Sequence, residues 1–444
     1  MKVLMFGWEY PPHISGGLGT ACHGLTKALS RKGIAIDFVV PRLYGDEPTN
    51  GAELCQASGE FELPCNEDIS KIESSLSFLP IASTMIPYES EQDYAERMKR
   101  RFENPKGRFS ETKRPFSQVK RPFGKRTFSV SLQGGYGSNL FEEVRRYSMV
   151  AGSLAKQKDY DIIHAHDWLC YKAGEVAKKI SGKPLIVHVH ATEYDRSGEN
   201  INRQVYELER QGMEAADVIV CVSEFTRKTV ITKYNQPSSK VVCIHNGVEP
   251  QNCNKRTQDN IFGKTIVSFI GRVTYQKGPD YFVEAAAKVL EKDRNFVFVM
   301  AGDGDMLDKM TALVAKKRIS ENFFFTGFLK PDELKQLLAE TSVFVMPSVS
   351  EPFGIAPLEA MSSGVAAVIS RQSGVSEVLT HAIKVDFWDI DAMSDAIYSI
   401  GRHKALSDML CEKGKAEVAA LTWDKAADKL SELYNQIANK TPQI

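Results

Sequence analysis

The sequence predicts an α/β protein made of two consecutive domains, each built on a parallel sheet with helices on both faces. Three observations support this prediction. The chain has 444 residues, which is more than one ordinary hydrophobic core accommodates. Two regions alternate short apolar, β-rich runs with segments of helical length, which is typical of buried parallel sheets. A polar stretch without apolar periodicity, residues 246–260, separates the two regions and is the predicted linker.

The first domain is expected to span residues 1–250 and to contain six strands. These are short apolar runs bounded by polar or turn-forming residues, at 3–6, 36–40, 161–166, 184–190, 217–222 and 240–245. Amphipathic stretches between them predict helices at 18–31 and 139–156. Two such domains in tandem leave a cleft between the carboxyl ends of their strands, where ligands of these folds usually bind.

The second domain is expected at residues 261–421. Its predicted strands lie at 265–271, 296–302, 323–327, 343–347 and 366–370, with helices at 278–292, 331–340 and 355–364. The remaining segment, 422–444, contains a strongly amphipathic stretch at 422–437. We expect it to form a C-terminal helix that can cross back to the first domain.

Composition and charge indicate a globular protein without a polyanionic partner. Apolar residues make up 43% of the chain, and 56 Lys and Arg balance 56 Asp and Glu, so nucleic acid is not an expected ligand. None of the eight cysteines forms a C-x-x-C pair, which favours reduced, buried thiols. The first apolar run is too short for a signal peptide, and no window of ~18 apolar residues predicts a membrane span. We therefore expect a cytoplasmic location.

Residues 95–126 depart from this pattern. They contain twelve Lys or Arg against three Glu, and Phe102, Phe109, Phe116 and Phe123 recur every seven residues. Prolines between these rings argue against a coiled coil and favour a disordered tandem repeat. The base-rate interpretation is a surface loop without a dedicated role. The alternative is a docking segment for an anionic or carbohydrate partner, or for a membrane surface.

A glycine-rich loop follows the first predicted strand. Gly16, Gly17 and Gly19 stand at the start of the expected helix, where glycines allow a ligand to approach the backbone and free N–H groups favour anions. The spacing is not the G-x-G-x-x-G of dinucleotide sites, and a plain strand–helix turn is the alternative.

The second domain has a sharper set of charged residues. Arg272 and Lys277 follow the strand at 265–271, and two cations at the carboxyl end of a strand suit a diphosphate. Glu351 precedes a Pro-Phe-Gly turn, and Glu359 lies eight positions later, about two helical turns. A solvated helix carboxylate explains a lone Glu359, and favourable charge near a helix start explains a lone Glu351.

Histidines at two strand ends suggest a different class of function. His164 and His166, and likewise His188 and His190, would lie on one face of their strands. His-x-His pairs of this kind are half-sites in metal-dependent hydrolases. That hypothesis expects a barrel and leaves Arg272 unexplained.

Taken together, these features resemble the retaining glycosyltransferases of the GT-B fold, in which two Rossmann-like domains face a deep cleft. Within that group the chain looks most like the bacterial and archaeal glycogen and starch synthases. The pieces occur in family order along nearly the whole chain: Gly-Gly-Leu at 16–18, His-Asp-Trp at 166–168, His190, Asn246–Gly247, Gly-Arg through Lys-Gly at 271–278, and Glu-x7-Glu at 351–359.

The resemblance implies a role for each matching residue. Arg272 and Lys277 would hold the donor diphosphate and stabilise its departure. Glu359 would bind the nucleotide ribose, and Glu351 would meet the donor sugar. The remaining positions would line the donor phosphates and sugar (Gly16, Gly17, Phe353, Gly354, Ile355, His190) or the acceptor and hinge side (Asp167, Asn246). No metal or cofactor is implied, because the cations take that place.

The implied reaction moves glucose from UDP- or ADP-glucose to the non-reducing end of an α-1,4-glucan with retention. Glu351 as the nucleophile of a double displacement is the other route by analogy with retaining glycosidases. Ile14 stands where glycogen synthases of this type usually carry Lys. Relatives that act on another sugar, a lipid or a small molecule often lack that Lys, so such an acceptor is the alternative function.

Overall fold

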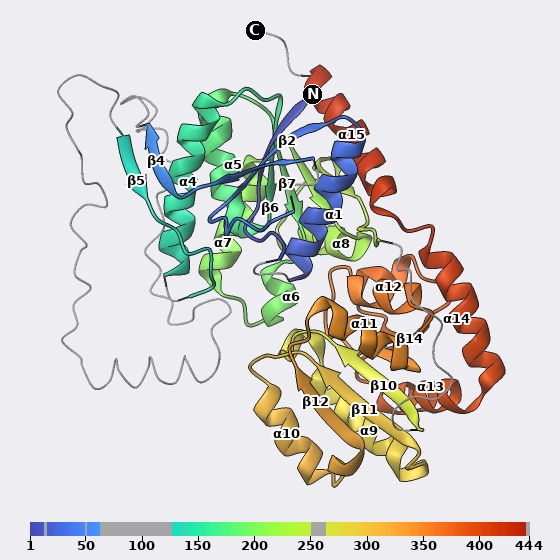
Figure 1. Ribbon diagram of the computed structural model, residues 1–444. Coiled ribbons are helices and arrows are strands. Elements are labelled where there is room, and N and C mark those ends of the chain that lie inside the picture. Colours follow the sequence, from blue (N-terminus) through green and yellow to red (C-terminus); the bar gives the residue numbers. More distant parts are fainter. Residues whose placement is uncertain (13–15, 49–50, 63–126, 138, 250–262, 441–444) are drawn as a thin grey trace, which may run out of the picture.

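The computed structural model describes residues 1–12, 16–48, 51–62, 127–137, 139–249 and 263–440 (Figure 1). Within these residues the chain forms two α/β domains, each containing one parallel sheet, as the sequence predicts. The predictions for the basic repeat at 95–126 and for most of the linker, residues 250–260, lie outside the described residues.

The first sheet has seven parallel strands in the order β3-β2-β1-β6-β7-β8-β9. The chain starts in the middle at β1, builds outward to β3 and then returns to the other side of β1. A topological switch point therefore lies between β1 and β6, and ligands of such sheets bind at the carboxyl ends near this point. The strands are β1 (Lys2–Phe6), β2 (Ala35–Val40), β3 (Glu53–Gln56), β6 (Ile162–His166), β7 (Leu185–Val189), β8 (Val218–Cys221) and β9 (Val241–Cys243).

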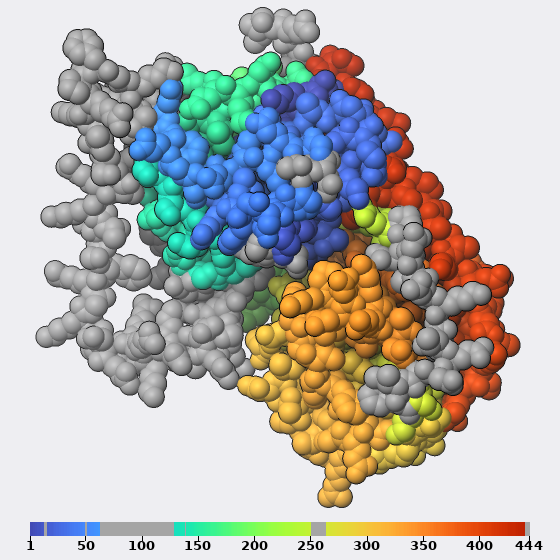
Figure 2. Space-filling view, viewed as in Figure 1, coloured from blue at the N-terminus to red at the C-terminus, as the bar shows by residue number. Residues whose placement is uncertain are grey.

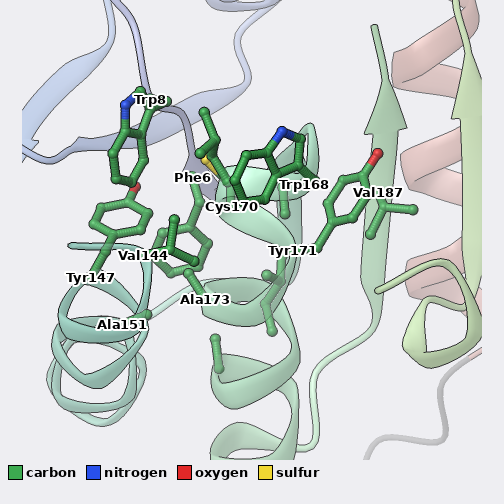
Figure 3. Packing of buried hydrophobic residues seen from close by; sticks show 14 of the residues in the cluster. Phe6, Trp8, Val144, Tyr147, Ala151, Trp168, Cys170, Tyr171, Ala173 and Val187 are labelled. Atoms are coloured by element: carbon green, nitrogen blue, oxygen red, sulfur yellow. The ribbon is translucent and has the colours of Figure 1, made fainter. Parts of the chain in front are cut away.

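Helices cover both faces of this sheet because alternate strand residues enter two different cores. Ile162 packs in the core shared with α1 (Gly17–Arg31) and the C-terminal helix, whereas Ile163 packs in the core shared with the opposite helices. Figure 3 shows that second core, where Trp8 and Tyr147 meet edge to face beside Trp168. Its helices are α4 (Leu140–Gln157), α5 (Trp168–Ser181), α7 (Arg203–Ala215) and part of α8 (Glu224–Lys233).

The second sheet repeats the arrangement with six parallel strands in the order β12-β11-β10-β13-β14-β15. They are β10 (Thr265–Ile270), β11 (Phe296–Ala301), β12 (Phe323–Gly327), β13 (Val343–Met346), β14 (Ala366–Ser370) and β15 (Ile383–Val385). Their switch point lies between β10 and β13. One face carries α9 (Pro279–Lys292), α10 (Leu307–Lys316) and α13 (Ile390–Arg402), and the other carries α11 (Pro331–Glu340) and α12 (Ile355–Ser362). Within the described residues, no helix combines the length and apolar character needed to span a membrane.

The sequence analysis did not predict four of the strands. β3 is a four-residue edge strand with two exposed ends, and β15 has three residues, so neither contains a readable apolar pattern. β4 (Gly59–Glu62) pairs antiparallel with β5 (Thr127–Val130) in a separate two-stranded sheet. That pairing joins segments far apart in the sequence, which local periodicity cannot reveal.

The chain ends with two helices, α14 (Lys404–Val418) and α15 (Trp423–Lys440), which run along the side of both domains (Figure 2). α14 lies against α12 and α13 of the second domain, whereas α15 lies against α1 of the first. Ion pairs join Arg31 to Asp424 at 2.8 Å and Lys32 to Asp428. The link between the two helices pairs with the end of the first domain, because the Val248 amide donates to the Leu421 carbonyl at 2.9 Å.

Trp423 anchors α15 on the first domain. Its indole is 4% exposed, and a Cβ added at Gly24 of α1 would lie 2.4 Å from the ring, so the helix and the indole fit together only with glycine there. We expect Trp423→Ala to lower the free energy of unfolding by about 3–5 kcal/mol in urea denaturation, the usual cost of truncating a buried Trp.

Trp388→Ala is the matched control for this prediction, because Trp388 is 58% exposed and its loss should change stability by less than about 0.5 kcal/mol. Equal effects of the two substitutions would contradict the docking of α15.

Candidate active site

The loops that follow the strands of the two sheets face one another. Helix α6 (Glu193–Ser197), which follows β7, contacts the 3-10 turn Tyr275–Lys277 that follows β10. Figure 1 shows α6 at the edge of the first domain that is turned toward the second. Ser350 Oγ donates to Asp195 Oδ1 at 2.6 Å, and Ser223 Oγ donates to the Pro352 carbonyl at 2.5 Å. Both switch points open toward this boundary, which is therefore the place for an interdomain ligand.

The two predicted phosphate-binding cations lie together at the carboxyl end of β10. Lys277 ends the 3-10 turn, and its Nζ forms an ion pair with the carboxylate of Glu351. Ser348 Oγ donates to the same Glu351 oxygen at 3.2 Å. Arg272 follows β10 after one intervening glycine, and it is exposed. The structure thus brings together Lys277 and Glu351, which lie far apart in the sequence.

Gly278 allows the turn after β10 to approach the loop after β13. Its φ is 62°, and a Cβ at this position would lie 2.3 Å from the Pro347 carbonyl oxygen. Any larger residue would therefore separate the two loops. The close approach sets Lys277 beside Glu351.

The segment from Glu351 to Glu359 leads from β13 into α12. Glu351 lies in the loop, Phe353 is buried, Gly354 has a φ of 102°, and the helix begins at Ile355. The helix begins after the Pro-Phe-Gly turn, as the sequence predicts, so Glu359 lies on the helix and Glu351 precedes it. Burial raises the pKa of the Glu359 carboxyl. Hydrogen bonds donated by a bound ligand would favour its ionised form.

Glu9, which the sequence analysis did not single out, occupies the start of α1. Its Oε2 accepts the N–H groups of Gly16 and Gly19 at 3.1 and 3.2 Å, and the Tyr136 hydroxyl donates to its Oε1. Burial raises the pKa of Glu9, and these three hydrogen bonds and the positive charge of Arg272 act in the opposite direction. The positive charge of Arg272, in the second domain, thus acts on a carboxylate of the first domain. An acidic residue between the first strand and a glycine loop was the signal that could have revealed it.

The space beside the glycine loop differs between its first two glycines. A Cβ on Gly16 would lie 3.1 Å from a Glu9 oxygen, whereas a Cβ on Gly17 would meet no atom within 4 Å from the described residues outside its own stretch of chain. The group that approaches the backbone at Gly16 is therefore the protein's own Glu9 carboxylate. The open space at Gly17 leaves room for an external ligand.

His190 and Asp167 form one unit at the carboxyl ends of β6 and β7. Asp167 Oδ1 accepts the backbone N–H of His190 at 2.7 Å and that of Ala191 at 3.3 Å. His190 Nε2 lies 2.9 Å from Nδ1 of His166. Burial raises the pKa of Asp167 to about 7, although the charge of Arg196 and the two backbone donors oppose it. Burial lowers the pKa of His190 to about 3, so its ring is neutral at physiological pH.

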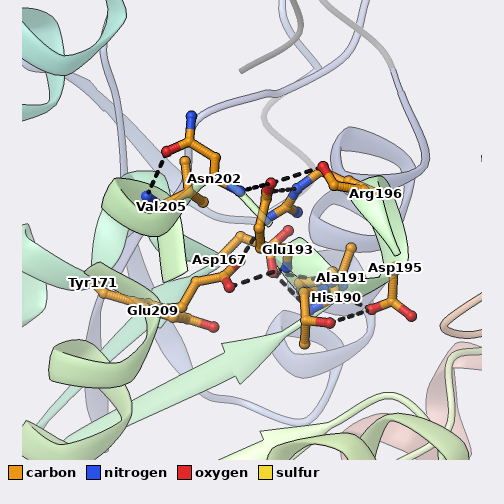
Figure 4. A network of polar contacts seen from close by, with 12 residues as sticks. Asp167, Tyr171, His190, Ala191, Glu193, Asp195, Arg196, Asn202, Val205 and Glu209 are labelled. Atoms are coloured by element: carbon orange, nitrogen blue, oxygen red, sulfur yellow. Dashed lines mark hydrogen bonds and ion pairs between the residues drawn. The ribbon is translucent and has the colours of Figure 1, made fainter. Parts of the chain in front are cut away.

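Arg196 on α6 holds two buried carboxylates beside this unit (Figure 4). Its Nε lies 3.2 Å from Glu193, and its NH2 group forms an ion pair with Glu209 on α7. The Tyr234 hydroxyl also donates to Glu209. Burial raises the pKa of Glu209 to about 7, and Arg196 and this hydroxyl act against the shift only in part. The network fixes α6, the element that contacts the second domain.

Asn246 lies in the loop after β9, next to the place where the chain crosses between domains. A Cβ on its neighbour Gly247 would lie 2.3 Å from the backbone nitrogen of Trp423, so this loop and the start of α15 touch closely. Nearby, His245 Nε2 lies 3.1 Å from Glu377 of the second domain. Asn246 thus lies on the side of the interdomain boundary where the loop after β9 meets the start of α15.

The four histidines lie on one face of the sheet, as strand alternation predicts. The hydrolase hypothesis also predicted a barrel, and that prediction is wrong. His164 and His166 on β6 and His188 on β7 stack with His190 on the face that carries α1 and α15. The described residues form two open parallel sheets instead of a barrel. The histidines therefore need a separate explanation.

Comparison with known families identifies the class of protein that this fold and site define. The family model Glycosyltransferase Family 4 matches residues 118–252, and the model Glycosyl transferases group 1 matches residues 253–417. The two models meet inside the predicted linker: one matches the second half of the first domain, and the other matches nearly all of the second domain. The second domain therefore matches the model of the group 1 glycosyltransferases, and the two-domain architecture of the chain is the GT-B fold.

Two of the similar proteins match nearly the whole chain, and a third matches about two thirds of it. The uncharacterized glycosyltransferase MJ1607 of Methanocaldococcus jannaschii is 28% identical over 98% of both chains. A glycogen synthase of Mycobacterium tuberculosis is 22% identical over 98% of this chain and 94% of its own. A UDP-Gal:alpha-D-GlcNAc-diphosphoundecaprenol alpha-1,3-galactosyltransferase of Escherichia coli is 27% identical over 65% of this chain and 78% of its own.

Two solved structures share the fold. Sucrose-phosphate synthase of Thermosynechococcus elongatus superimposes with a TM-score of 0.68 at 16% identity, covering 99% of this chain and all of that one. HepE of Anabaena, in complex with UDP and glucose, superimposes with a TM-score of 0.65 at 14% identity, covering 98% of this chain and all of that one.

Proposed function

We propose that this protein is a retaining hexosyltransferase that moves glucose from UDP-glucose or ADP-glucose to the non-reducing end of an α-1,4-glucan. The observation that carries the proposal is the Lys277–Glu351 pair at the carboxyl end of the second sheet. It places a cation suited to phosphate beside a buried carboxylate suited to a sugar. The pair lies near the hydrogen bond between Ser350 and Asp195, which joins the two domains. Asp195 belongs to α6, the helix that follows His190 in the first domain.

The donor diphosphate would lie against Lys277 and Arg272. In the absence of donor, Glu351 is the anionic partner of Lys277, and bound phosphate would share or replace that partner. The ribose hydroxyls would donate to Glu359, whose half-buried side chain sits on α12. The backbone of Phe353, Gly354 and Ile355 would meet the donor at the start of that helix, where N–H groups favour anions.

The first domain would complete the donor site. The open space beside Gly17 would admit a phosphate as the domains close, and His190, which is neutral, would contact the sugar. Asp167 holds the His190 backbone and would line the acceptor side, with Asn246 at the hinge. Closure would exclude water and so limit hydrolysis of the donor.

The proposed reaction breaks the bond between the anomeric carbon and the diphosphate. Positive charge develops on the sugar ring, and the two cations stabilise the departing diphosphate. The acceptor hydroxyl attacks from the same face, and its proton passes to the leaving phosphate oxygen. Lys277 Nζ and Ser348 Oγ both donate to Oε2 of Glu351 and so hold this carboxylate in place, and we assign Glu351 an orienting role.

A second candidate function differs in the acceptor. Ile14 replaces the Lys that glycogen synthases usually carry, and the Escherichia coli relative acts, by its name, on a diphosphoundecaprenol-linked sugar. A lipid or small-glycan acceptor is therefore the alternative, with the same donor site and the same chemistry.

A donor-by-acceptor assay tests both candidates. Purified protein receives UDP-glucose, ADP-glucose or GDP-mannose, each with and without glycogen, and release of nucleoside diphosphate is measured. We expect release that requires a glucose donor and glycogen together, and an α-configured product by NMR. Release unaffected by glycogen with every donor would remove the glucan acceptor, and a β-configured product would remove retention.

A further inference from the structure

Four histidine rings form a buried stack on one face of the first sheet. His164 and His166 come from β6, His188 comes from β7, and His190 follows β7. The ring centroids are 4.4 Å apart between His164 and His166, 5.3 Å between His166 and His188, and 4.3 Å between His188 and His190. The function proposed above uses His190 and leaves the other three rings unexplained.

All four rings carry a buried nitrogen without a hydrogen-bond partner among the described residues, which in His190 is Nδ1. His164 and His166 are completely buried, and His188 is 2% exposed. Among the described residues, no hydrogen bond reaches Nε2 of His164, Nε2 of His166 or either ring nitrogen of His188. Native proteins leave few buried polar atoms unsatisfied, because each loses its hydrogen bonds to water without replacement. Such a concentration in one place points to a bound group.

The other nitrogens of two of these rings are held by hydrogen bonds. His164 Nδ1 lies 2.6 Å from the hydroxyl of Tyr434 on α15, and His166 Nδ1 lies 2.9 Å from His190 Nε2. Histidines that bind metal ions use one nitrogen for the ion and the other for such an outer partner, which fixes the ring. One ring nitrogen each of His164, His166 and His188 lie within 4.8 Å of one another.

We propose that His164, His166 and His188 bind a divalent transition-metal ion, which we take to be Zn²⁺. Imidazole nitrogens are preferred ligands of Zn²⁺, and three protein ligands with one water complete a tetrahedral site. Stacked rings must turn about their Cβ–Cγ bonds to converge on one ion, and that torsion has a broad energy well.

The surroundings suit such an ion. The set lies in the interior under α1 and α15, away from solvent, so the ion would take no part in sugar transfer. It would join β6 to β7, and through Tyr434 would tie α15 to the sheet that carries Asp167 and His190.

A neighbouring set offers a competing assignment. Cys22 of α1, His166 and His190 also have ligand atoms within 4.8 Å of one another. A thiolate ligand would favour the same ion, so the experiment must separate the two sets. Because they share only His166, variants of His188 and Cys22 distinguish them.

Elemental analysis of the full-length protein, produced in zinc-supplemented medium and desalted, provides the first test. We expect about one Zn²⁺ per chain in the wild-type protein and in His403→Asn, whose imidazole is exposed. His188→Asn should lose the ion, and Cys22→Ser should retain it. Far-UV circular dichroism of each variant checks folding.

Protein produced with Co²⁺ gives a second reading that needs no variant. Visible bands of a tetrahedral Co²⁺ without a thiolate charge-transfer band support the three-histidine site. Wild-type protein without stoichiometric metal would overturn the proposal, as would a thiolate band or metal that is lost in Cys22→Ser but kept in His188→Asn. None of these readings requires activity, so failure here is separate from failure of the proposed transferase function.

Discussion

Lys277→Ala is expected to lower the turnover number for sugar transfer by about 10²- to 10³-fold, the usual cost of removing one preorganised group that stabilises developing charge. Lys277 Nζ is the cation that would neutralise the departing diphosphate, and it already has an anionic partner in Glu351. Glu351→Gln keeps the size of the side chain and removes its charge, so we expect a loss of similar size. Nucleoside diphosphate release with saturating donor and acceptor measures both effects.

A control separates this effect from a general loss of surface charge. Lys288 on α9 is exposed and pairs with Asp391 on the surface, away from the interdomain boundary, so Lys288→Ala should keep wild-type turnover. Circular dichroism and the Tm of each variant establish that the protein remains folded. Wild-type turnover of a folded Lys277→Ala or Glu351→Gln protein would remove that residue from the proposed mechanism.

Arg196→Met is expected to lower the free energy of unfolding by about 3–5 kcal/mol, because it leaves two carboxylates buried without their cation. The Arg196 side chain is 11% exposed and lies between Glu193 and Glu209, whose side chains are 4% and 1% exposed. The Met side chain retains most of the apolar packing, so the loss reports mainly on charge. Urea denaturation followed by circular dichroism measures it.

Arg210→Met is the matched control for this second prediction. Arg210 also bridges two glutamates, Glu207 and Glu214, but it lies on the surface of α7 with its side chain 33% exposed. Water and salt screen such pairs, so the expected loss is below about 1 kcal/mol. A loss of that small size for Arg196→Met as well would show that the α6–α7 network does not depend on its charge.

The Arg196 network also explains why stability and function are linked in this region. α6 follows β7 directly, contacts the turn that carries Lys277, and contains Asp195, which accepts a hydrogen bond from Ser350. A loosened α6 would therefore move His190 relative to the second domain. Variants of Arg196 are expected to show reduced turnover before they unfold, because interdomain geometry depends on that helix.

The sequence was sufficient to predict the fold class and most of the elements that position the site. Apolar strands with helical spacing between them determine two parallel sheets, since only a sheet covered on both faces buries such runs. The positions of Arg272 and Lys277 after β10 followed from the same pattern. Alternation along β6 also predicted correctly that His164 and His166 share a face.

Other features were decided only by the tertiary structure. Tyr136 against Glu9 and Glu351 beside Lys277 are contacts between segments distant in the sequence, and local pattern contains no record of such contacts. The short strands β3 and β15 exist because a neighbouring strand offers hydrogen bonds to their backbones, not because of their own composition.

For the four stacked histidines, the sequence predicts which side chains share a face of each strand, and the tertiary structure decides whether the two pairs meet. The two His-x-His runs are visible in the sequence, and strand alternation places each pair on one face. Whether the pairs meet depends on the order of β6 and β7 in the sheet and on their register, in which His166 lies opposite His188. Strand periodicity is a local property that side-chain size and polarity determine, whereas register and burial depend on the packing of the whole sheet against α1 and α15.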